Sequence, residues 1–239
     1  NNFLSLAFDK SDSVGRLDEF SHEIKFATSF EEFMEIAWKM NSSPKTKLDY
    51  VVVCSPNHFH FSHIYSGLKL GCDVICEKPL VSSTRELDEL AILQNKTGKK
   101  VFTILQLRLH QEILKIKKQI SLRKSIKKYQ VNLTYITSRG KWYMESWKGD
   151  HKKSFGVCAN IGIHFFDMLS FIFGKCLKTE THYLDESRGS GYLEFEKAQV
   201  SWFLSIDKSD LPSNFNAKLK TFRAIKYDDN EIEFSGGFT

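Results

Sequence analysis

The stretch Tyr50-Val51-Val52-Val53-Cys54, followed by Ser55-Pro56-Asn57, decides the fold class of this chain. Five apolar residues without polar alternation are typical of a strand that is buried on both faces, as strands of parallel sheets are. The chain then turns into a helix that ends at Gly71, where glycine suits a left-handed cap. The stretch therefore predicts one strand-to-helix step of a parallel sheet.

The same alternation continues on both sides of this stretch. Further strands are expected at Phe3–Phe8, at Asp73–Cys76 and, fully buried, at Val101–Leu107. The capping boxes Ser29-x-x-Glu32 and Ser83-x-x-Glu86 each predict the start of a helix. Strands that alternate with helices favour a doubly wound α/β domain, which we place at residues 1–107.

After Leu107 the pattern changes to helices followed by strands. A helix carries Ile113 and Ile120, a long strand is expected at Lys128–Ser138, and one strongly apolar helix is expected at about Asn160–Phe173. Further strand-like runs are Gly191–Phe195, Gln199–Ile206, Lys220–Tyr227 and Glu231–Phe234. This order predicts an α+β domain with a mostly antiparallel sheet over residues 108–239.

The composition of the 239 residues is that of an ordinary globular protein, with 41% apolar residues, 26% charged residues and a net charge of +5. No run of about 18 uncharged apolar residues is present, and the chain opens without a signal-peptide pattern. We therefore expect a soluble cytoplasmic protein without a membrane partner. The five cysteines include no C-x-x-C pair, so we expect neither a disulfide framework nor a zinc site in this chain.

Two other patterns are given structural interpretations. The basic segment around Lys115–Lys128 has no interleaved aromatic residue to stack on bases, so it is interpreted as a solvated helix face followed by a loop, and no nucleic acid is expected as a partner. His58, His60 and His63 have no carboxylate or thiolate spaced to complete a metal site, so no metal is expected.

Three features could carry chemistry. Asp9 follows a strand, where an acidic residue can accept hydrogen bonds from a dinucleotide ribose. Lys78 follows the strand Asp73–Cys76, at the edge where open α/β sheets bind ligands. Asn160, His164 and Asp167 place polar groups on an apolar helix, and buried polar groups need partners. Trp142, Tyr143 and Trp147 lie beside Arg139 and indicate either a nucleotide pocket or a packed loop.

Taken together, Cys54-Ser55-Pro56-Asn57-x-x-His60, Glu77-Lys78-Pro79 and Gly162-x-His164-x-x-Asp167 resemble the Gfo/Idh/MocA oxidoreductases. Longer motifs resemble the members of that family that act on UDP-linked amino-uronic acids: Thr103–His110, Leu133–Gly140, Ser146–Asp150, Asn160–Leu169 and Trp202–Ile206. The resemblance covers essentially the whole chain. It implies a Rossmann-like domain and NAD-dependent oxidation of the 3-hydroxyl of UDP-N-acetylglucosaminuronic acid, in bacterial surface-polysaccharide (lipopolysaccharide) biosynthesis.

The resemblance also implies roles for individual residues. Lys78 and His164 would be the catalytic pair. The implied NAD contacts are Asp9, Ser55, Asn57, His60, Glu77, Lys78 and Gln106; the implied substrate contacts are Arg108, Ser138, Arg139, Trp147, Asn160 and His164. Many family members have Asp where this chain has Asn160, which removes one candidate base. A homo-oligomer formed through the second-domain sheet is expected.

Several alternatives follow from this sequence. Either neutral His164 takes the hydroxyl proton while cationic Lys78 stabilises the oxygen, or neutral Lys78 is the base and His164 orients. The chain could also be a non-catalytic binder of NAD or a nucleotide sugar, or a dehydrogenase of another sugar.

The family's first strand and Gly-rich turn would precede Asn1, and helical sequence would follow Thr239. We therefore expect at least about tenfold weaker NAD binding than in an N-terminally extended chain.

Overall fold

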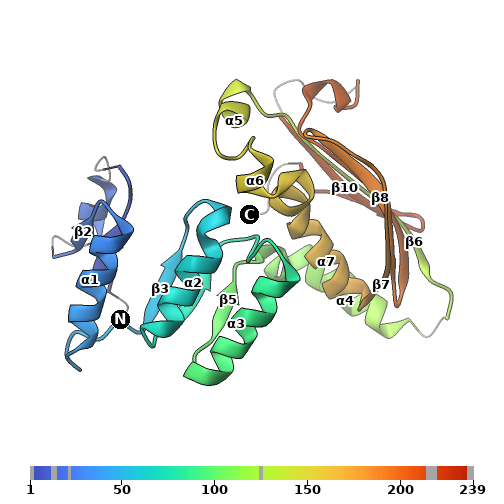
Figure 1. The fold of residues 1–239 in the computed structure, drawn as a ribbon. Helices are drawn as coiled ribbons and strands as arrows, with labels where there is room; N and C mark the ends of the chain where they lie inside the picture. The colour runs from blue at the N-terminus through green and yellow to red at the C-terminus, as the bar shows by residue number, and fades with distance from the viewer. Residues whose placement is uncertain (1–2, 12–14, 21–22, 124–125, 214–219, 236–239) are drawn as a thin grey trace. The chain divides into compact units, whose positions relative to one another are not determined.

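The computed structural model describes residues 3–11, 15–20, 23–123, 126–213 and 220–235 (Figure 1). The chain divides into two compact units. The first comprises Asn1–Val53, Ser62–Ile75 and Asp88–Phe102; the second comprises Cys54–Phe61, Cys76–Leu87 and Thr103–Thr239. The terminal residues Asn1 and Thr239, and Lys124 of the basic segment, lie outside the described residues.

The first unit begins with two short parallel strands, β1 (Leu6–Phe8) and β2 (Lys25–Ala27), and the helix α1 (Phe30–Asn41). The predicted capping box opens α1, because the Ser29 hydroxyl accepts the Glu32 N–H at 3.1 Å. Leu6 packs there with Ala37 and Met40 of α1. Sequence analysis missed β2, since three residues give too little pattern, and also the 3-10 turn Gly15–Glu19.

A second sheet has the strand order β3 (Tyr50–Val53), β4 (Asp73–Cys76), β5 (Val101–Thr103). The helices α2 (His60–Lys69) and α3 (Thr84–Thr97) connect these strands in turn, as crossovers between parallel strands require. The predicted left-handed cap is confirmed at Gly71, with φ of +77°. A Cβ atom on Gly67 of α2 would lie 2.9 Å from Val74, so α2 packs closely on one face of the sheet.

Two expectations about these strands are wrong. Tyr50 and Val52 are more than half exposed, because β3 is covered on one face only, the face that carries Val51 and Val53. The strand expected at Val101–Leu107 ends at Thr103. A 3-10 turn (Gln106–Leu109) then takes Leu107 out of the sheet and into the core of the second unit.

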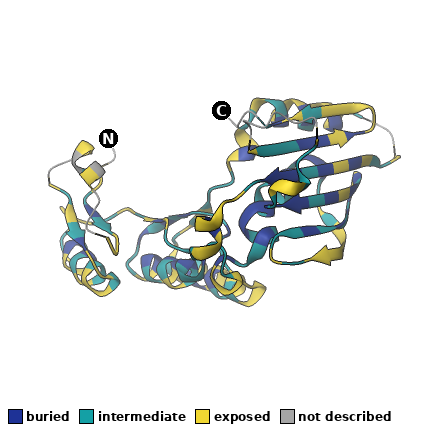
Figure 2. Ribbon diagram, turned by 90° about the horizontal axis from the view of Figure 1, so that it is seen from above, coloured by how far each residue is buried: buried dark blue, intermediate teal, exposed yellow. Residues whose placement is uncertain are grey.

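The second unit is built on a six-stranded sheet in the order β11-β10-β6-β9-β8-β7. Neighbouring strands are antiparallel except β6 and β9, which are parallel; the expected mostly antiparallel sheet is thereby confirmed. The bounds are Tyr129–Thr137 (β6), Cys176–Leu184 (β7), Arg188–Phe195 (β8), Ala198–Ser205 (β9), Thr221–Tyr227 (β10) and Asn230–Glu233 (β11). Buried and less buried residues alternate along the strands (Figure 2). Sequence analysis missed β7, whose residues are almost all exposed.

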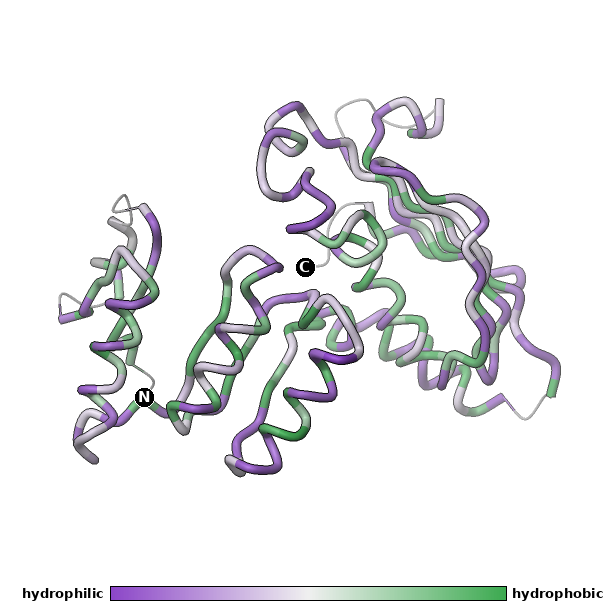
Figure 3. The backbone as a smooth tube through the Cα atoms, in the orientation of Figure 1, coloured by the Kyte–Doolittle hydropathy of each residue, from purple (hydrophilic) through white to green (hydrophobic). Residues whose placement is uncertain are grey.

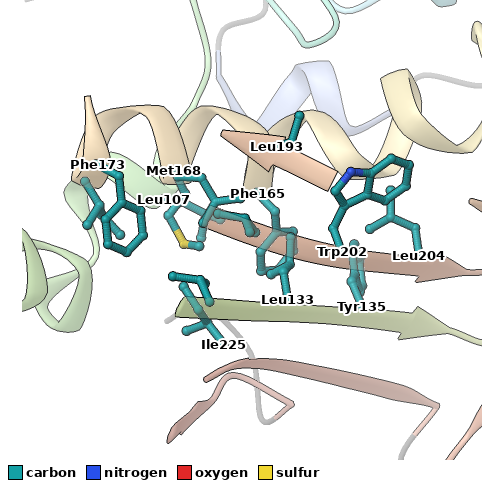
Figure 4. Close-up of a cluster of buried hydrophobic side chains, with 14 of the residues drawn as sticks. Leu107, Leu133, Tyr135, Phe165, Met168, Phe173, Leu193, Trp202, Leu204 and Ile225 are labelled. Carbon is teal, nitrogen blue, oxygen red and sulfur yellow. The ribbon is translucent and has the colours of Figure 1, made fainter. Parts of the chain in front are cut away.

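Two helices, α4 (Gln111–Leu122) and α7 (Ile163–Phe173), cover one face of this sheet (Figure 1). Phe165 and Met168 point from α7 toward the strands, where they meet Leu133, Tyr135 and other apolar side chains (Figure 4). The apolar character of α7 is visible along its whole length (Figure 3). The helical stretch His151–Phe173 is long and apolar enough to cross a membrane by length and composition alone. Packing of α7 in the core accounts for that composition.

Candidate active site

A cavity of about 330 Å³ lies in the second unit, at the turns that follow β3 and β4. Its other walls come from the end of β6, the short helix α5 (Lys141–Glu145), the segment after it, and the turn that leads into α7. The lining residues are Cys54, Ser55, Asn57, Glu77, Lys78, Tyr135, Arg139, Trp142, Tyr143, Trp147, Lys148, Asn160, Ile161 and His164.

Lys78 is held at this cavity by its neighbours. Its ammonium donates a hydrogen bond to the Asn160 carbonyl at 2.5 Å, and its backbone N–H donates to the Glu77 carboxylate at 3.3 Å. Burial lowers the pKa of the Lys78 ammonium; the Glu77 carboxylate opposes this, while the cations of Lys148 and Arg139 lower it further. A carbonyl oxygen only accepts hydrogen bonds, so the contact with Asn160 requires a proton on the Lys78 nitrogen.

Asn160 lies in a π-helical turn, Cys158–Gly162, which replaces the first turn of the helix expected from Asn160. Such turns are frequent at functional sites because they redirect backbone groups. The Asn160 carbonyl receives Lys78, and the Asn160 side-chain amide donates to the Tyr143 hydroxyl at 2.9 Å. Asn160 therefore connects the turn after β4 with α5.

His164 stands in the first turn of α7, close to Lys78. Burial lowers the pKa of its imidazole to about 4, and the charges of Lys78 and Arg223 contribute while Asp167 opposes them. Its Nδ1 atom is buried and has no hydrogen-bond partner among the described residues. The ring is therefore neutral near pH 7. Gly162 permits the close packing of this turn, since a Cβ atom there would lie 2.6 Å from Leu204.

His60 does not line the cavity, but its ring lies between two of the turns that do. The residue is fully buried, and its ring nitrogens lie 2.7 Å from the Pro79 carbonyl oxygen and 2.8 Å from the Ser55 carbonyl oxygen. These two contacts join the turn after β3 to the turn after β4. Its ring nitrogens contact the backbone, and the implied contact between His60 and a dinucleotide stays a prediction.

We expect the variant His60→Phe to lower the free energy of unfolding by about 1–3 kcal/mol, since a buried carbonyl group loses the imidazole N–H that it accepts. Lys78 should lose its fixed position at the same time, because it immediately precedes Pro79. Urea unfolding of the variant and of the exposed control His182→Phe measures the effect. A His60→Phe variant as stable as the wild type would contradict this supporting role.

Other implied site residues lie outside the cavity lining. The Arg108 guanidinium donates to both carboxylate oxygens of Asp167, at 2.8 and 2.5 Å. Gln106 belongs to the 3-10 turn before α4, and the Ser138 N–H donates to the Lys220 carbonyl. Asp9 belongs to the first unit, directly after β1, where its carboxylate accepts the Ser11 N–H at 2.9 Å.

The aromatic segment lies at the cavity, and Tyr143 belongs to the apolar core of the second unit as well. Trp142, Tyr143 and Trp147 all line the cavity. Sequence analysis did not single out Tyr135, Lys148, Cys54 or Ile161. Lys148 directly follows Trp147, so its position beside the aromatic group was the one available signal.

The cavity carries more positive than negative charge. Lys78, Arg139 and Lys148 line it, against the single carboxylate of Glu77 among the described lining residues. The Lys148 ammonium lies 5.4 Å from the ring centre of Trp142 and 5.8 Å from that of Trp147, and the Arg139 guanidinium lies 5.5 Å from that of Tyr143. Cations beside aromatic walls suit an anionic ligand that also presents a ring.

Comparisons with known proteins agree with this arrangement. Residues 6–105 match the model described as "Oxidoreductase family, NAD-binding Rossmann fold", and residues 117–218 match that family's C-terminal alpha/beta domain. The WlbA (WbpB) dehydrogenase from Thermus thermophilus, solved in complex with NAD and UDP-GlcNAcA, is 41% identical with a TM-score of 0.94. That likeness covers 99% of this chain and 76% of the Thermus chain.

Curated relatives are more distant. The D-glucoside 3-dehydrogenase of Escherichia coli K12 is 29% identical over 134 residues, which are 54% of this chain and 36% of that protein. The putative oxidoreductase YteT of Bacillus subtilis is 25% identical over 163 residues, which are 67% of this chain and 36% of that protein. The chain thus spans about a third of the length of these two curated relatives.

Proposed function

Because the chain belongs to the Gfo/Idh/MocA oxidoreductase family, we propose that it oxidises the 3-hydroxyl of UDP-N-acetylglucosaminuronic acid to the 3-keto sugar with NAD, in bacterial surface-polysaccharide biosynthesis in the cytoplasm. The observation that carries this proposal is one cavity that combines Lys78, neutral His164, two further cations and aromatic walls. The UDP-GlcNAcA bound by the Thermus dehydrogenase is an anionic, ring-bearing ligand of this kind.

The residues present fit a nicotinamide dinucleotide. Ser55, Asn57 and Glu77 follow the carboxyl ends of β3 and β4, where open α/β sheets bind nucleotides. Gln106 is a further proposed contact, and Asp9 of the first unit, directly after β1, is the proposed partner of a ribose. NAD, when bound, supplies the hydride acceptor.

His164 is the residue we assign as the proton acceptor for the substrate hydroxyl. Its imidazole is neutral, and its Nδ1 atom has no hydrogen-bond partner among the described residues. Lys78 is held on the Asn160 carbonyl and, as a cation, stabilises the negative charge that develops on the oxidised oxygen. The opposite assignment, with neutral Lys78 as base, is favoured only by the lowered pKa of Lys78.

The anionic groups of the substrate give the other cations a role. Arg139 and Lys148 have no carboxylate partner among the described residues, and both border the cavity. We assign them to the sugar carboxylate and the diphosphate, with Trp147 and Asn160 as neighbours. Arg108 and Ser138 lie outside the lining and would reach the substrate only by changing their present hydrogen bonds.

A panel of sugars tests the proposed function. The protein is incubated with NAD and UDP-GlcNAcA, UDP-glucuronate, UDP-GlcNAc or a D-glucoside, and NADH formation is followed by absorbance. We expect turnover with UDP-GlcNAcA above all. Preference for a D-glucoside would favour the second candidate, a 3-dehydrogenase of another sugar, which the Escherichia coli relative supports. Binding of UDP-GlcNAcA without any turnover would indicate the non-catalytic alternative.

We expect the variant Lys148→Gln to raise the KM for UDP-GlcNAcA about tenfold with little change in kcat, because a charge-assisted hydrogen bond contributes about 1.5–3 kcal/mol to binding. The discrimination against UDP-GlcNAc, which lacks the sugar carboxylate, should fall if Lys148 binds that carboxylate. Steady-state kinetics of this variant beside Lys96→Gln, an exposed lysine on α3, measure both effects. An unchanged KM would remove Lys148 from substrate binding.

We also propose that the protein forms a homo-oligomer through the six-stranded sheet, on the face that α4 and α7 leave uncovered. That face carries neutral polar side chains such as Gln130 and Gln199, which are hydrogen-bonded to each other at 2.8 Å. Light scattering of the purified protein tests this: a monomeric mass would contradict it.

A further inference from the structure

Tyr143 carries a hydroxyl group whose proton is directed to no residue of the described chain. We propose that this hydroxyl donates a hydrogen bond to an oxygen of the substrate sugar bound beside Lys78, which makes Tyr143 a further substrate-binding residue. The inference rests on the proposed function and deepens it, since it assigns a contact that neither the sequence motifs nor the comparisons supply.

The tyrosine ring is fixed in place. Tyr143 lies on α5, is only 4% exposed and belongs to the main apolar core of the second unit. The indole of Trp142 packs edge-on against it with ring centres 6.0 Å apart, and the Arg139 guanidinium lies 5.5 Å from its ring centre. Tyr143 lines the cavity, and its hydroxyl is bonded to Asn160, which lines the cavity as well.

The hydrogen-bond pattern determines what the hydroxyl can do. The Asn160 amide nitrogen, which only donates, bonds to the Tyr143 oxygen at 2.9 Å. The oxygen therefore accepts this bond and keeps its own proton for another partner. No acceptor for that proton is found among the described residues. Burial raises the pKa of the Tyr143 phenol, so it stays protonated near neutral pH and acts as a donor.

Asn160 also relates this donor to the proposed catalytic pair. Its backbone carbonyl receives the Lys78 ammonium, while its side-chain amide orients the Tyr143 hydroxyl. The positions of two hydrogen-bond donors, the Lys78 ammonium and the Tyr143 hydroxyl, are thus fixed by two groups of Asn160. A sugar carries oxygen or acetamido substituents on neighbouring carbons, so a ring whose reacting oxygen meets Lys78 presents a second oxygen to Tyr143. Asn160 lies in the π-helical turn, a feature that is frequent at functional sites.

The conservative variant Tyr143→Phe removes the hydroxyl and keeps the ring. We expect kcat/KM for UDP-GlcNAcA to fall about 10- to 100-fold, because the substrate oxygen and the Asn160 amide both lose a partner. The dissociation constant for NAD should stay at its wild-type value, while the melting temperature should fall by a few degrees because the Asn160 amide loses its buried acceptor. The matched control is Tyr227→Phe, a buried tyrosine of β10 outside the cavity lining, which should change none of the three quantities.

The outcomes separate this inference from the proposed function. Wild-type turnover of UDP-GlcNAcA together with an unchanged kcat/KM in Tyr143→Phe overturns the role of Tyr143 alone. A loss of NAD affinity as large as the loss of kcat/KM overturns it as well, because it indicates a purely structural tyrosine. If the wild type oxidises no sugar nucleotide, the proposed function fails. Calorimetric titration with UDP-GlcNAcA then tests the contact with Tyr143 separately. Equal affinities of the wild type and Tyr143→Phe, or no binding by either protein, overturn that contact.

Discussion

Replacing His164 with Asn is expected to lower kcat for UDP-GlcNAcA by about 10²- to 10⁴-fold, the usual contribution of a general acid–base group. The KM should change little, because Asn retains a polar side chain at the same place in α7. The expectation follows from the neutral, buried imidazole beside Lys78 and from its unpaired Nδ1 atom among the described residues. Turnover is measured by NADH absorbance at saturating NAD and substrate.

The pH dependence provides a second readout of the same role. The pKa of His164 is lowered from 6.5 to about 4, mainly by burial. A proton acceptor must be neutral, so the acidic limb of the kcat/KM profile should lie near pH 4 rather than near pH 6.5, and it should disappear in His164→Asn. The lowered pKa also means that the native state loses stability relative to the unfolded state as the pH falls from about 6.5 to about 4, since the unfolded imidazole gains its proton first.

A control excludes a general effect of losing a histidine. His182 on β7 is well exposed and pairs only with Glu180, so His182→Asn should keep wild-type turnover. If His164→Asn also keeps wild-type turnover with an intact fold, His164 is a structural residue, and the catalytic assignment moves to Lys78 as base.

The residues that sequence analysis located best are those fixed by strand ends and helix starts. Lys78 follows a strand whose bounds, Asp73–Cys76, were predicted correctly, and His164 lies in an apolar helix that the core requires. Their approach to one cavity depends on the turn after β4 and on the π-helical turn at Cys158–Gly162. No periodicity signals a π-helical turn, so the two hydrogen bonds of Asn160 could not be predicted.

The contacts that sequence analysis did not predict depend on tertiary packing. His60 resembles a ligand-binding residue in its motif, yet its ring joins two backbone turns that are 24 residues apart in sequence. In the sequence Arg108 is a cation available to the substrate, whereas in the structure its guanidinium is hydrogen-bonded to the Asp167 carboxylate. Lys148 and Tyr135 come from different elements and become neighbours of the cavity only when α5 folds against the end of β6.

The variant Lys78→Met is expected to lower kcat by about 10²- to 10³-fold, the usual cost of removing a donor that stabilises a developing oxyanion. Methionine keeps the length and most of the apolar surface of the lysine but not its charge, so the fold should persist, although the Asn160 carbonyl loses its partner.

Single-turnover hydride transfer, followed by NADH absorbance, measures the effect on the chemical step. Lys118→Met, an exposed lysine on α4, is the matched control. A variant Lys78→Arg that recovers part of the rate at pH 7 would support the charge, because arginine cannot act as a base there. An unchanged rate in Lys78→Met would leave Lys78 as a residue that merely anchors the Asn160 turn.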